Sequence, residues 1–132
     1  MTTSPYILDA SAILGYIYGK AGYEEVGKYL RSKSFVSTIQ LGEVHYILLQ
    51  EEGREKAQSA LVTLRNTDID IVSVDEELVL EASEVKVSTG IPYIDSVAAG
   101  LAQIKSGTLV TSDGDFERLE GHYDLKLKWI ED

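Results

Sequence analysis

Five acidic residues in four separate stretches of this chain have the types and positions that could do chemistry together. Asp9 follows a short apolar run, and Asp113 and Asp115 follow another, so both runs end in carboxylates. Glu43 and Asp95 stand at the margins of the apolar faces of two segments with helical spacing. Taken alone, each acid has an ordinary structural interpretation: a helix cap, an Asx turn, a solvated helix face or a first-turn acid that complements the helix dipole.

The combination of these acids favours a metal site. Carboxylates crowded into one crevice repel each other, and some would have raised pKa values unless a cation joined them. The chain has no cysteine and only two histidines, and oxygen ligands without Cys or clustered His favour Mg²⁺ or Mn²⁺ over zinc. Such ions polarise a phosphoryl oxygen and lower the pKa of a bound water, so phosphodiester hydrolysis is the reaction class this chemistry serves best.

The elements that would position the acids alternate along the chain. Short apolar or β-branched runs predict strands at residues 6–8, 35–39, 68–74, 109–111 and 125–130. Apolar residues at helical spacing predict helices at about 10–19, 22–32, 41–52, 54–65, 75–89 and 93–105, with at most one helical turn at 116–119. Mostly apolar strands between helices indicate an α/β fold, a three-layer α/β/α sandwich whose mainly parallel sheet has four to five strands. In such a sheet the ligand crevice lies beyond the carboxyl ends of the strands, where three of the acids fall.

Length and composition are those of an ordinary globular protein. A chain of 132 residues predicts one domain spanning residues 1–132. Its 44% hydrophobic and 26% charged residues argue against disorder. The lack of cysteine excludes a disulfide scaffold, a thiol nucleophile and an iron–sulfur cluster. Residues 1–5 lack the features of an export signal, and no apolar run reaches the ~20 residues of a membrane helix, so we expect a cytoplasmic protein.

The net charge limits how the chain could bind nucleic acid. Twelve Lys and Arg against 22 Asp and Glu give −10, which argues against a generally basic surface that binds phosphates. Affinity for RNA would need a local basic patch, since screening makes local charge matter more than the total. The candidates, each of which is more simply interpreted as solvated surface, are Lys20, Lys28, Arg31, Lys33 and Arg118.

The sequence around the five acids resembles that of a PIN domain, and more narrowly the VapC-type ribonuclease toxins of prokaryotic toxin–antitoxin pairs. Four motifs carry the resemblance by their order and spacing, and together they cover nearly the whole chain: Tyr6–Ser11, Thr38–Leu49, Ile91–Ala99 and Leu109–Phe116. The resemblance implies metal-ligating roles for four of the acids, with Asp115 as a fifth acid of the site: Asp9, Glu43, Asp95 and Asp113. It also implies that Ser11 orients a carboxylate or a bound water and that Thr111 is a hydrogen-bond donor behind the ligands.

The resemblance also implies a function. Members of the family cleave RNA with Mg²⁺ or Mn²⁺, usually act as homodimers and are held inactive by a cognate antitoxin. We therefore expect a metal-dependent endoribonuclease, the toxin of a VapBC-type pair, with RNA as substrate and no membrane association. The chain departs from the family at Gly42, where a larger residue often precedes the helix glutamate; the glycine lowers helix propensity without touching the chemistry.

Two other functions stay open at the level of sequence. One is a non-catalytic PIN-like scaffold that binds RNA or protein and need not bind Mg²⁺. The other is a Rossmann-like phosphatase or phosphoacceptor with an aspartyl-phosphate at Asp9, although Ser11 stands where haloacid-dehalogenase-like enzymes have a second aspartate.

Two further residue types have unsettled roles. His45 lies outside the apolar stripe of its helix, which favours a surface or interface residue over a general base. Five tyrosines in the first three predicted helices form either the edge of the core or a surface for a dimer partner or antitoxin: Tyr16, Tyr18, Tyr23, Tyr29 and Tyr46.

Overall fold

The computed structural model describes residues 4–131. Residues 1–3, which belong to the segment that lacks the features of an export signal, lie outside the described residues, as does residue 132. One parallel sheet has the strand order β3-β2-β1-β4-β5. Its strands are β1 (Tyr6–Leu8), β2 (Ser34–Ser37), β3 (Ile69–Val72), β4 (Thr108–Thr111) and β5 (Lys126–Trp129). Within residues 4–131, every helix is too short or too polar to cross a membrane.

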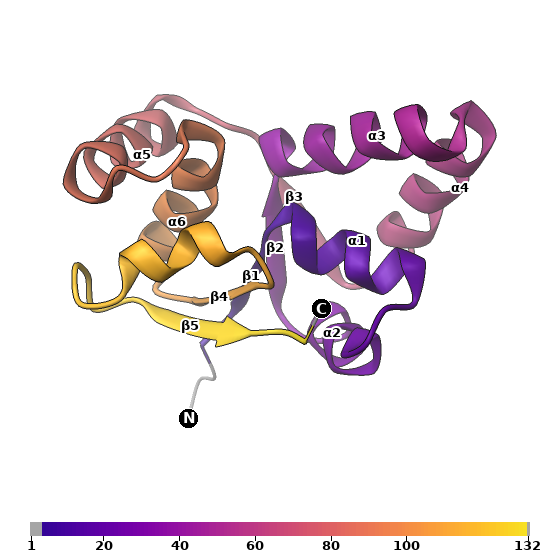
Figure 1. Ribbon diagram of the computed structural model, residues 1–132, viewed down its shortest axis with the longest axis horizontal. Helices are drawn as coiled ribbons and strands as arrows, with labels where there is room; N and C mark the ends of the chain where they lie inside the picture. Colours follow the sequence, from indigo (N-terminus) through magenta and orange to yellow (C-terminus); the bar gives the residue numbers. More distant parts are fainter. Residues whose placement is uncertain (1–3, 132) are drawn as a thin grey trace.

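Helices cover both faces of the sheet (Figure 1). They are α1 (Ala10–Tyr18), α2 (Tyr23–Leu30), α3 (Thr38–Glu52), α4 (Arg54–Arg65), α5 (Glu76–Thr89), α6 (Tyr93–Lys105) and the 3₁₀ helix η1 (Gly114–Leu119). Successive strand residues point to opposite faces. Leu8 and Val110 therefore join the core under α1–α4, whereas Ile7 and Leu109 join a second core under α5, α6 and η1. The structure confirms the predicted three-layer sandwich and gives its sheet five strands.

The clearest error in the predicted elements lies between the second strand and the third helix. The β-branched run predicts a strand over residues 35–39, but the strand ends at Ser37 and α3 begins at Thr38. The Ser37 hydroxyl accepts a hydrogen bond from the backbone N–H of Gln40 at 3.1 Å, so it caps the helix. The cap outweighs the strand preference of Thr38 and Ile39 and begins α3 three residues before the predicted Leu41.

The connection from β3 to β4 places the carboxyl ends of β1 and β4 side by side. From β1 the chain builds β2 and β3 on one side, and it then returns through α5 and α6 to add β4 on the other side of β1. The carboxyl ends of β1 and β4 therefore flank a topological switch point, where crevices form in open α/β sheets. A Cβ atom at Gly100 of α6 would lie 3.1 Å from the backbone nitrogen of Ala82 in α5, so the glycine lets these two helices pack closely.

Candidate metal centre

Asp9 lies at the base of the site, directly after β1, and is only 4% exposed. Its Oδ1 accepts hydrogen bonds from the backbone N–H of Ala12 at 2.9 Å and from the Ser11 hydroxyl at 2.8 Å. Its Oδ2 accepts a bond from the hydroxyl of Thr111 at 2.6 Å. The expected helix cap is therefore present, and it occupies only part of a carboxylate that can accept about four bonds.

Burial dominates the electrostatics of Asp9. Removal from water raises the pKa of its carboxyl group from 3.8 to about 6, although the hydrogen bonds from Thr111, Ala12 and Ser11 oppose the rise. The nearby charge of Asp113 adds to it. Asp9 therefore keeps its proton more readily than an ordinary aspartate.

Asp113 and Asp115 are presented by the turn that leads from β4 into η1. The Oδ1 of Asp113 accepts the backbone N–H of Asp115 at 2.9 Å, which is the Asx turn that the sequence allows. The backbone N–H of Asp113 donates to the Thr111 hydroxyl oxygen at 2.9 Å. The turn thus orients both acids toward the same end of the sheet as Asp9.

Ser11 and Thr111 join the two strand ends. The Ser11 hydroxyl oxygen accepts the backbone N–H of Ser112 at 3.0 Å while its own hydrogen is directed at Asp9. Thr111 links Asp9 to Asp113 in the same way, through its donated and its accepted bond. Both residues lie behind the carboxylates, where the resemblance to a family predicts supporting hydroxyls.

Glu43 reaches the site from the second turn of α3 and Asp95 from the first turn of α6, and both are half-buried. Partial burial raises the pKa of Glu43, and the charge of Asp113 adds to the rise. Burial raises the pKa of Asp95 from 3.8 to about 7, and the charges of Asp113, Glu43, Asp9 and Asp115 add in that order. The charges of all four other acids therefore act on Asp95, and the five predicted residues form one electrostatic cluster.

Three of these acids form the compact part of the cluster. In the described part of the chain, carboxylate oxygens of Asp95, Asp113 and Asp115 all lie within 4.8 Å of one another. Ligands on opposite sides of a Mg²⁺ ion are about 4.2 Å apart, since each is about 2.1 Å from the metal. Small side-chain rotations would therefore let this all-oxygen set bind a hard divalent cation. Asp9 and Glu43, which the resemblance makes direct ligands, lie outside this group of three.

A buried glutamine next to the site was missed at the level of sequence. Gln40 is 1% exposed, and its Nε2 donates to the backbone carbonyl of Ile94, the residue before Asp95, at 2.7 Å. The available signal was the spacing Ser37-x-x-Gln40, a capping-box pattern. That pattern predicts a bond back to the start of the same helix, so it does not identify the contact with α6.

The remaining candidates lie away from the acids or stay unassigned. Lys33 directly precedes β2, at the amino end of the sheet, so it cannot form a basic patch beside the acids. Arg118 lies in η1 and donates from Nη1 to the Gly90 carbonyl at 3.0 Å. His45 is half-buried, and its Nε2 is enclosed without a hydrogen-bond partner in the described structure, so it is not a freely solvated surface residue.

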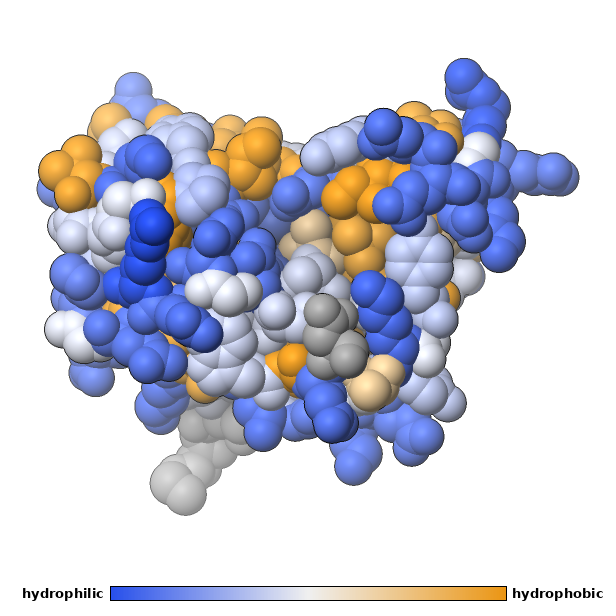
Figure 2. All heavy atoms as spheres, viewed as in Figure 1, coloured by the Kyte–Doolittle hydropathy of each residue, from blue (hydrophilic) through white to orange (hydrophobic). Residues whose placement is uncertain are grey.

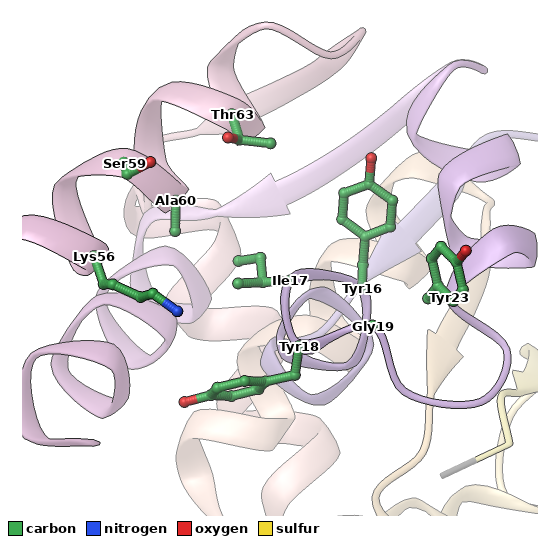
Figure 3. Close-up of a pocket in the computed structure, with 9 residues that line it drawn as sticks. All are labelled: Tyr16, Ile17, Tyr18, Gly19, Tyr23, Lys56, Ser59, Ala60 and Thr63. Carbon is green, nitrogen blue, oxygen red and sulfur yellow. The ribbon is translucent and has the colours of Figure 1, made fainter. Parts of the chain in front are cut away.

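A second concave region lies between α1 and α4, in a pocket of about 490 Å³ (Figure 3). Tyr16, Tyr18 and Tyr23 line it from α1 and the start of α2, with Lys56 and Thr63 facing them from α4. Tyr29, by contrast, stacks on Tyr6 with ring centroids 4.2 Å apart, at the edge of the core. The early tyrosines therefore divide between the lining of a pocket and the edge of the core. Among the described residues, no carboxylate lines this pocket. The candidate metal ligands therefore all lie in the acidic cluster.

The space-filling view shows a hollow between the α3–α4 and α5–α6 pairs (Figure 2). A family model described as "PIN domain" matches residues 6–122. No curated protein matches the chain in sequence.

Solved structures match the fold over most of its length. VapBC2 from Rickettsia felis, bound to a DNA fragment from its promoter, aligns with a TM-score of 0.77 at 21% identity, covering 96% of this chain and 98% of that one. A DNA-bound VapBC from Salmonella typhimurium aligns with a TM-score of 0.76 at 14% identity, over 96% and 98%. Mycobacterium tuberculosis VapC20, described as a sarcin-ricin loop cleaving toxin, aligns with a TM-score of 0.69 at 21% identity, over 92% and 98%.

Proposed function

The chain belongs to the PIN-domain family, and on that premise we propose that it is a metal-dependent endoribonuclease, the toxin of a VapBC-type pair. The proposal treats residues 1–132 as one domain that acts in the cytoplasm. The observation that carries it is the group of carboxylate oxygens from Asp95, Asp113 and Asp115, all within 4.8 Å of one another. It is supported by the likeness in fold to VapC20, a toxin described as cleaving the sarcin-ricin loop.

Mg²⁺ or Mn²⁺ bound by these acids would supply a polarised phosphoryl oxygen and a water of lowered pKa. The five acids have distinct parts in the proposal. Asp95, Asp113 and Asp115 hold the ion directly, and Glu43 adds charge and a ligand from the opposite helix. Asp9 accepts hydrogen bonds from Ser11 and Thr111, which keep its carboxylate oriented toward the ion.

The charge of the cluster explains why a cation is needed before RNA can bind. Five carboxylates would repel a phosphodiester. Burial raises the pKa values of Asp9 and Asp95, and the charges of neighbouring acids add to the rise. A divalent ion offsets part of that charge at the point where the phosphate must approach. Arg118, on the 3₁₀ helix that also carries Asp115, is the basic side chain we propose for contact with the RNA backbone.

Cleavage of RNA by the purified protein tests the proposal. We expect cleavage with Mn²⁺ or Mg²⁺, none with EDTA, and a loss of at least about 100-fold in Asp95→Asn because a ligand and its charge are removed. Asp70→Asn is the matched control, since Asp70 is exposed on β3, and it should cleave like the wild type. Equal cleavage by Asp95→Asn and wild type would contradict the assignment of the site.

Calorimetric titration with Mn²⁺ separates the nuclease from a non-catalytic scaffold. A nuclease binds the ion in this cluster, so Asp95→Asn should abolish the binding heat, whereas a scaffold gives none with either protein. The phosphoacceptor alternative is disfavoured by Asp9, which is 4% exposed and accepts hydrogen bonds on both oxygens. An acid-labile phosphate on Asp9 after incubation with a phosphodonor would restore that alternative.

The proposal includes a cognate antitoxin and a homodimer as partners. One structure of similar fold is described as a toxin-antitoxin complex, and another as a member of the VapBC family of toxin-antitoxin systems. We propose the tyrosine-lined pocket between α1 and α4 as the antitoxin surface, because tyrosine is enriched in protein interfaces. Thr63→Arg, which fills the pocket, should prevent copurification with the coexpressed antitoxin, and Val87→Arg on the exposed face of α5 should not. Light scattering of the purified toxin tests the dimer.

A further inference from the structure

Gln40 is a buried polar side chain whose two ends have different partners. It is 1% exposed and lies in the first turn of α3. Its Oε1 accepts a hydrogen bond from the hydroxyl of Ser37, the cap of the same helix. Its Nε2 donates to the backbone carbonyl of Ile94 in α6, at 2.7 Å. The amide therefore joins the amino ends of two helices that the sequence separates by 54 positions.

The position of this bond relates it directly to the acids. The Ile94 carbonyl belongs to the peptide group whose nitrogen is that of Asp95, and Gln40 precedes Glu43 by three residues, almost one helical turn. The bond thus connects the backbone at Asp95 to the turn that carries Glu43. The negative charge of Glu43 raises the pKa of Asp95, so the two carboxylates repel each other. Without a cation, that repulsion acts to move α3 and α6 apart, and the Gln40 amide opposes it.

We propose that Gln40 is a positioning residue that holds α3 against α6, so that Glu43 and Asp95 face one ion before it binds. This inference rests on the proposed metal site and adds to it a residue that touches neither ion nor substrate. Binding an ion to a preformed site costs less free energy than closing a site around the ion, because the ligands are already ordered when the protein folds. We call the hydrogen bond from Gln40 Nε2 to the Ile94 carbonyl the tie. Loss of the tie should therefore weaken metal binding while all five acids remain in the chain.

The competing interpretation is that Gln40 only supports the cap of α3. The two roles depend on different residues. Ser37 makes the cap of α3, whereas the Ile94 carbonyl accepts the hydrogen bond from Gln40 that joins α3 to α6. Ser37→Ala removes the cap and leaves Nε2 of Gln40 free to donate to Ile94. Gln40→Met keeps the length of the side chain and removes the tie. Gln40→Leu also removes the donor to Ile94 and adds no charge, so it serves if Gln40→Met fails to fold.

Calorimetric titration with Mn²⁺ gives the first test. We expect Gln40→Met to bind the ion at least about ten-fold more weakly than the wild type, and Ser37→Ala to bind it like the wild type despite a lower melting temperature. Gln50→Met, an exposed glutamine on the same helix, is the matched control and should bind normally. Wild-type affinity in both Gln40 variants would overturn the inference, whatever happens to their stability.

A distance measurement in EDTA keeps this inference separable from the proposed function. Because the chain has no cysteine, spin labels can be placed at Tyr46→Cys on α3 and at Val87→Cys on α5, which packs against α6. Both positions are exposed. We expect a longer and broader distance distribution in Gln40→Met than in wild type or Gln50→Met. If the wild type binds no Mn²⁺, the proposed function is wrong, and an unchanged distribution would then also overturn the tie.

Discussion

The hydroxyl group of Thr111 donates to Oδ2 of Asp9 at 2.6 Å, across 102 positions of sequence. The same hydroxyl oxygen accepts the backbone N–H of Asp113 at 2.9 Å. One buried side chain thus connects the carboxyl end of β1 to the turn that presents two further acids. It stabilises the charged form of Asp9, because its hydrogen bond is the largest of the effects that lower the pKa of that carboxyl group.

Thr111→Val should destabilise the protein and weaken the site together. The change removes the Thr111 hydroxyl that donates to Asp9 Oδ2 and leaves the Asp113 N–H without its acceptor. Each lost bond to a buried group costs about 1–3 kcal/mol. We expect a lower free energy of unfolding in urea and weaker Mn²⁺ binding by calorimetry. Thr108→Val, the same change at the other end of β4, is the control and should leave Mn²⁺ binding unchanged.

Asp95→Asn should raise the melting temperature of the metal-free protein. The substitution removes a charge that four neighbouring carboxylates repel and that burial disfavours. Thermal denaturation in EDTA measures the gain, and Asp70→Asn, at an exposed position, should show none. Added Mn²⁺ should raise the melting temperature of the wild type but not of Asp95→Asn, because only a protein that binds the ion is stabilised by it. A lower melting temperature for the variant in EDTA would contradict the crowding of charge.

The stability of the metal-free protein should fall as the pH rises from about 4 to about 7. Asp9 and Asp95 have folded pKa values of about 6 and about 7, both above the ordinary value of 3.8. In this range the folded state binds more protons than the unfolded state, so unfolding becomes easier as protons are lost. Urea unfolding in EDTA across the range measures the slope, which should be flatter in the double variant Asp9→Asn/Asp95→Asn.

Saturating Mn²⁺ should reverse that pH dependence. The ion binds the deprotonated carboxylates, so its stabilising effect grows as Asp9 and Asp95 lose their protons. The difference in melting temperature with and without Mn²⁺ should therefore be larger at about pH 8 than at about pH 5. A difference that is independent of pH would mean that the ion binds elsewhere.

Two glycine-to-alanine substitutions should have opposite effects on stability. A Cβ atom at Gly42 of α3 meets nothing within 4 Å, so Gly42→Ala should raise the free energy of unfolding by about 1 kcal/mol through helix propensity. A Cβ atom at Gly100 of α6 would lie 3.1 Å from the backbone of Ala82, so Gly100→Ala should lower it by about 1–3 kcal/mol. Urea unfolding compares them, and stabilisation by both would show that α5 and α6 are not closely packed.

Much of the fold follows from local patterns in the sequence. The alternation of apolar strands and helices predicts the parallel sheet, because helical spacing and strand burial are set by residues close together in the chain. Asp75 caps α5 through the N–H of Leu78, and Gly90 ends the same helix in a left-handed conformation, both as expected. The error at residues 38 and 39 shows where the local rule fails, since a single cap outweighed the strand preference of two β-branched residues.

The sequence by itself predicted the five acids of the proposed site, because it places them after strand ends and in the first two turns of helices, which fall at one edge of a parallel sheet. Only the tertiary structure decided how those acids group. A carboxylate oxygen of Asp115 lies within 4.8 Å of carboxylate oxygens of Asp95 and Asp113. The oxygens of Asp9 instead accept hydrogen bonds from Thr111 and Ser11. It also directed the Gln40 amide to Ile94 on another helix. Spacing along the chain determines which face a residue occupies, but distances between side chains on different elements depend on how those elements pack.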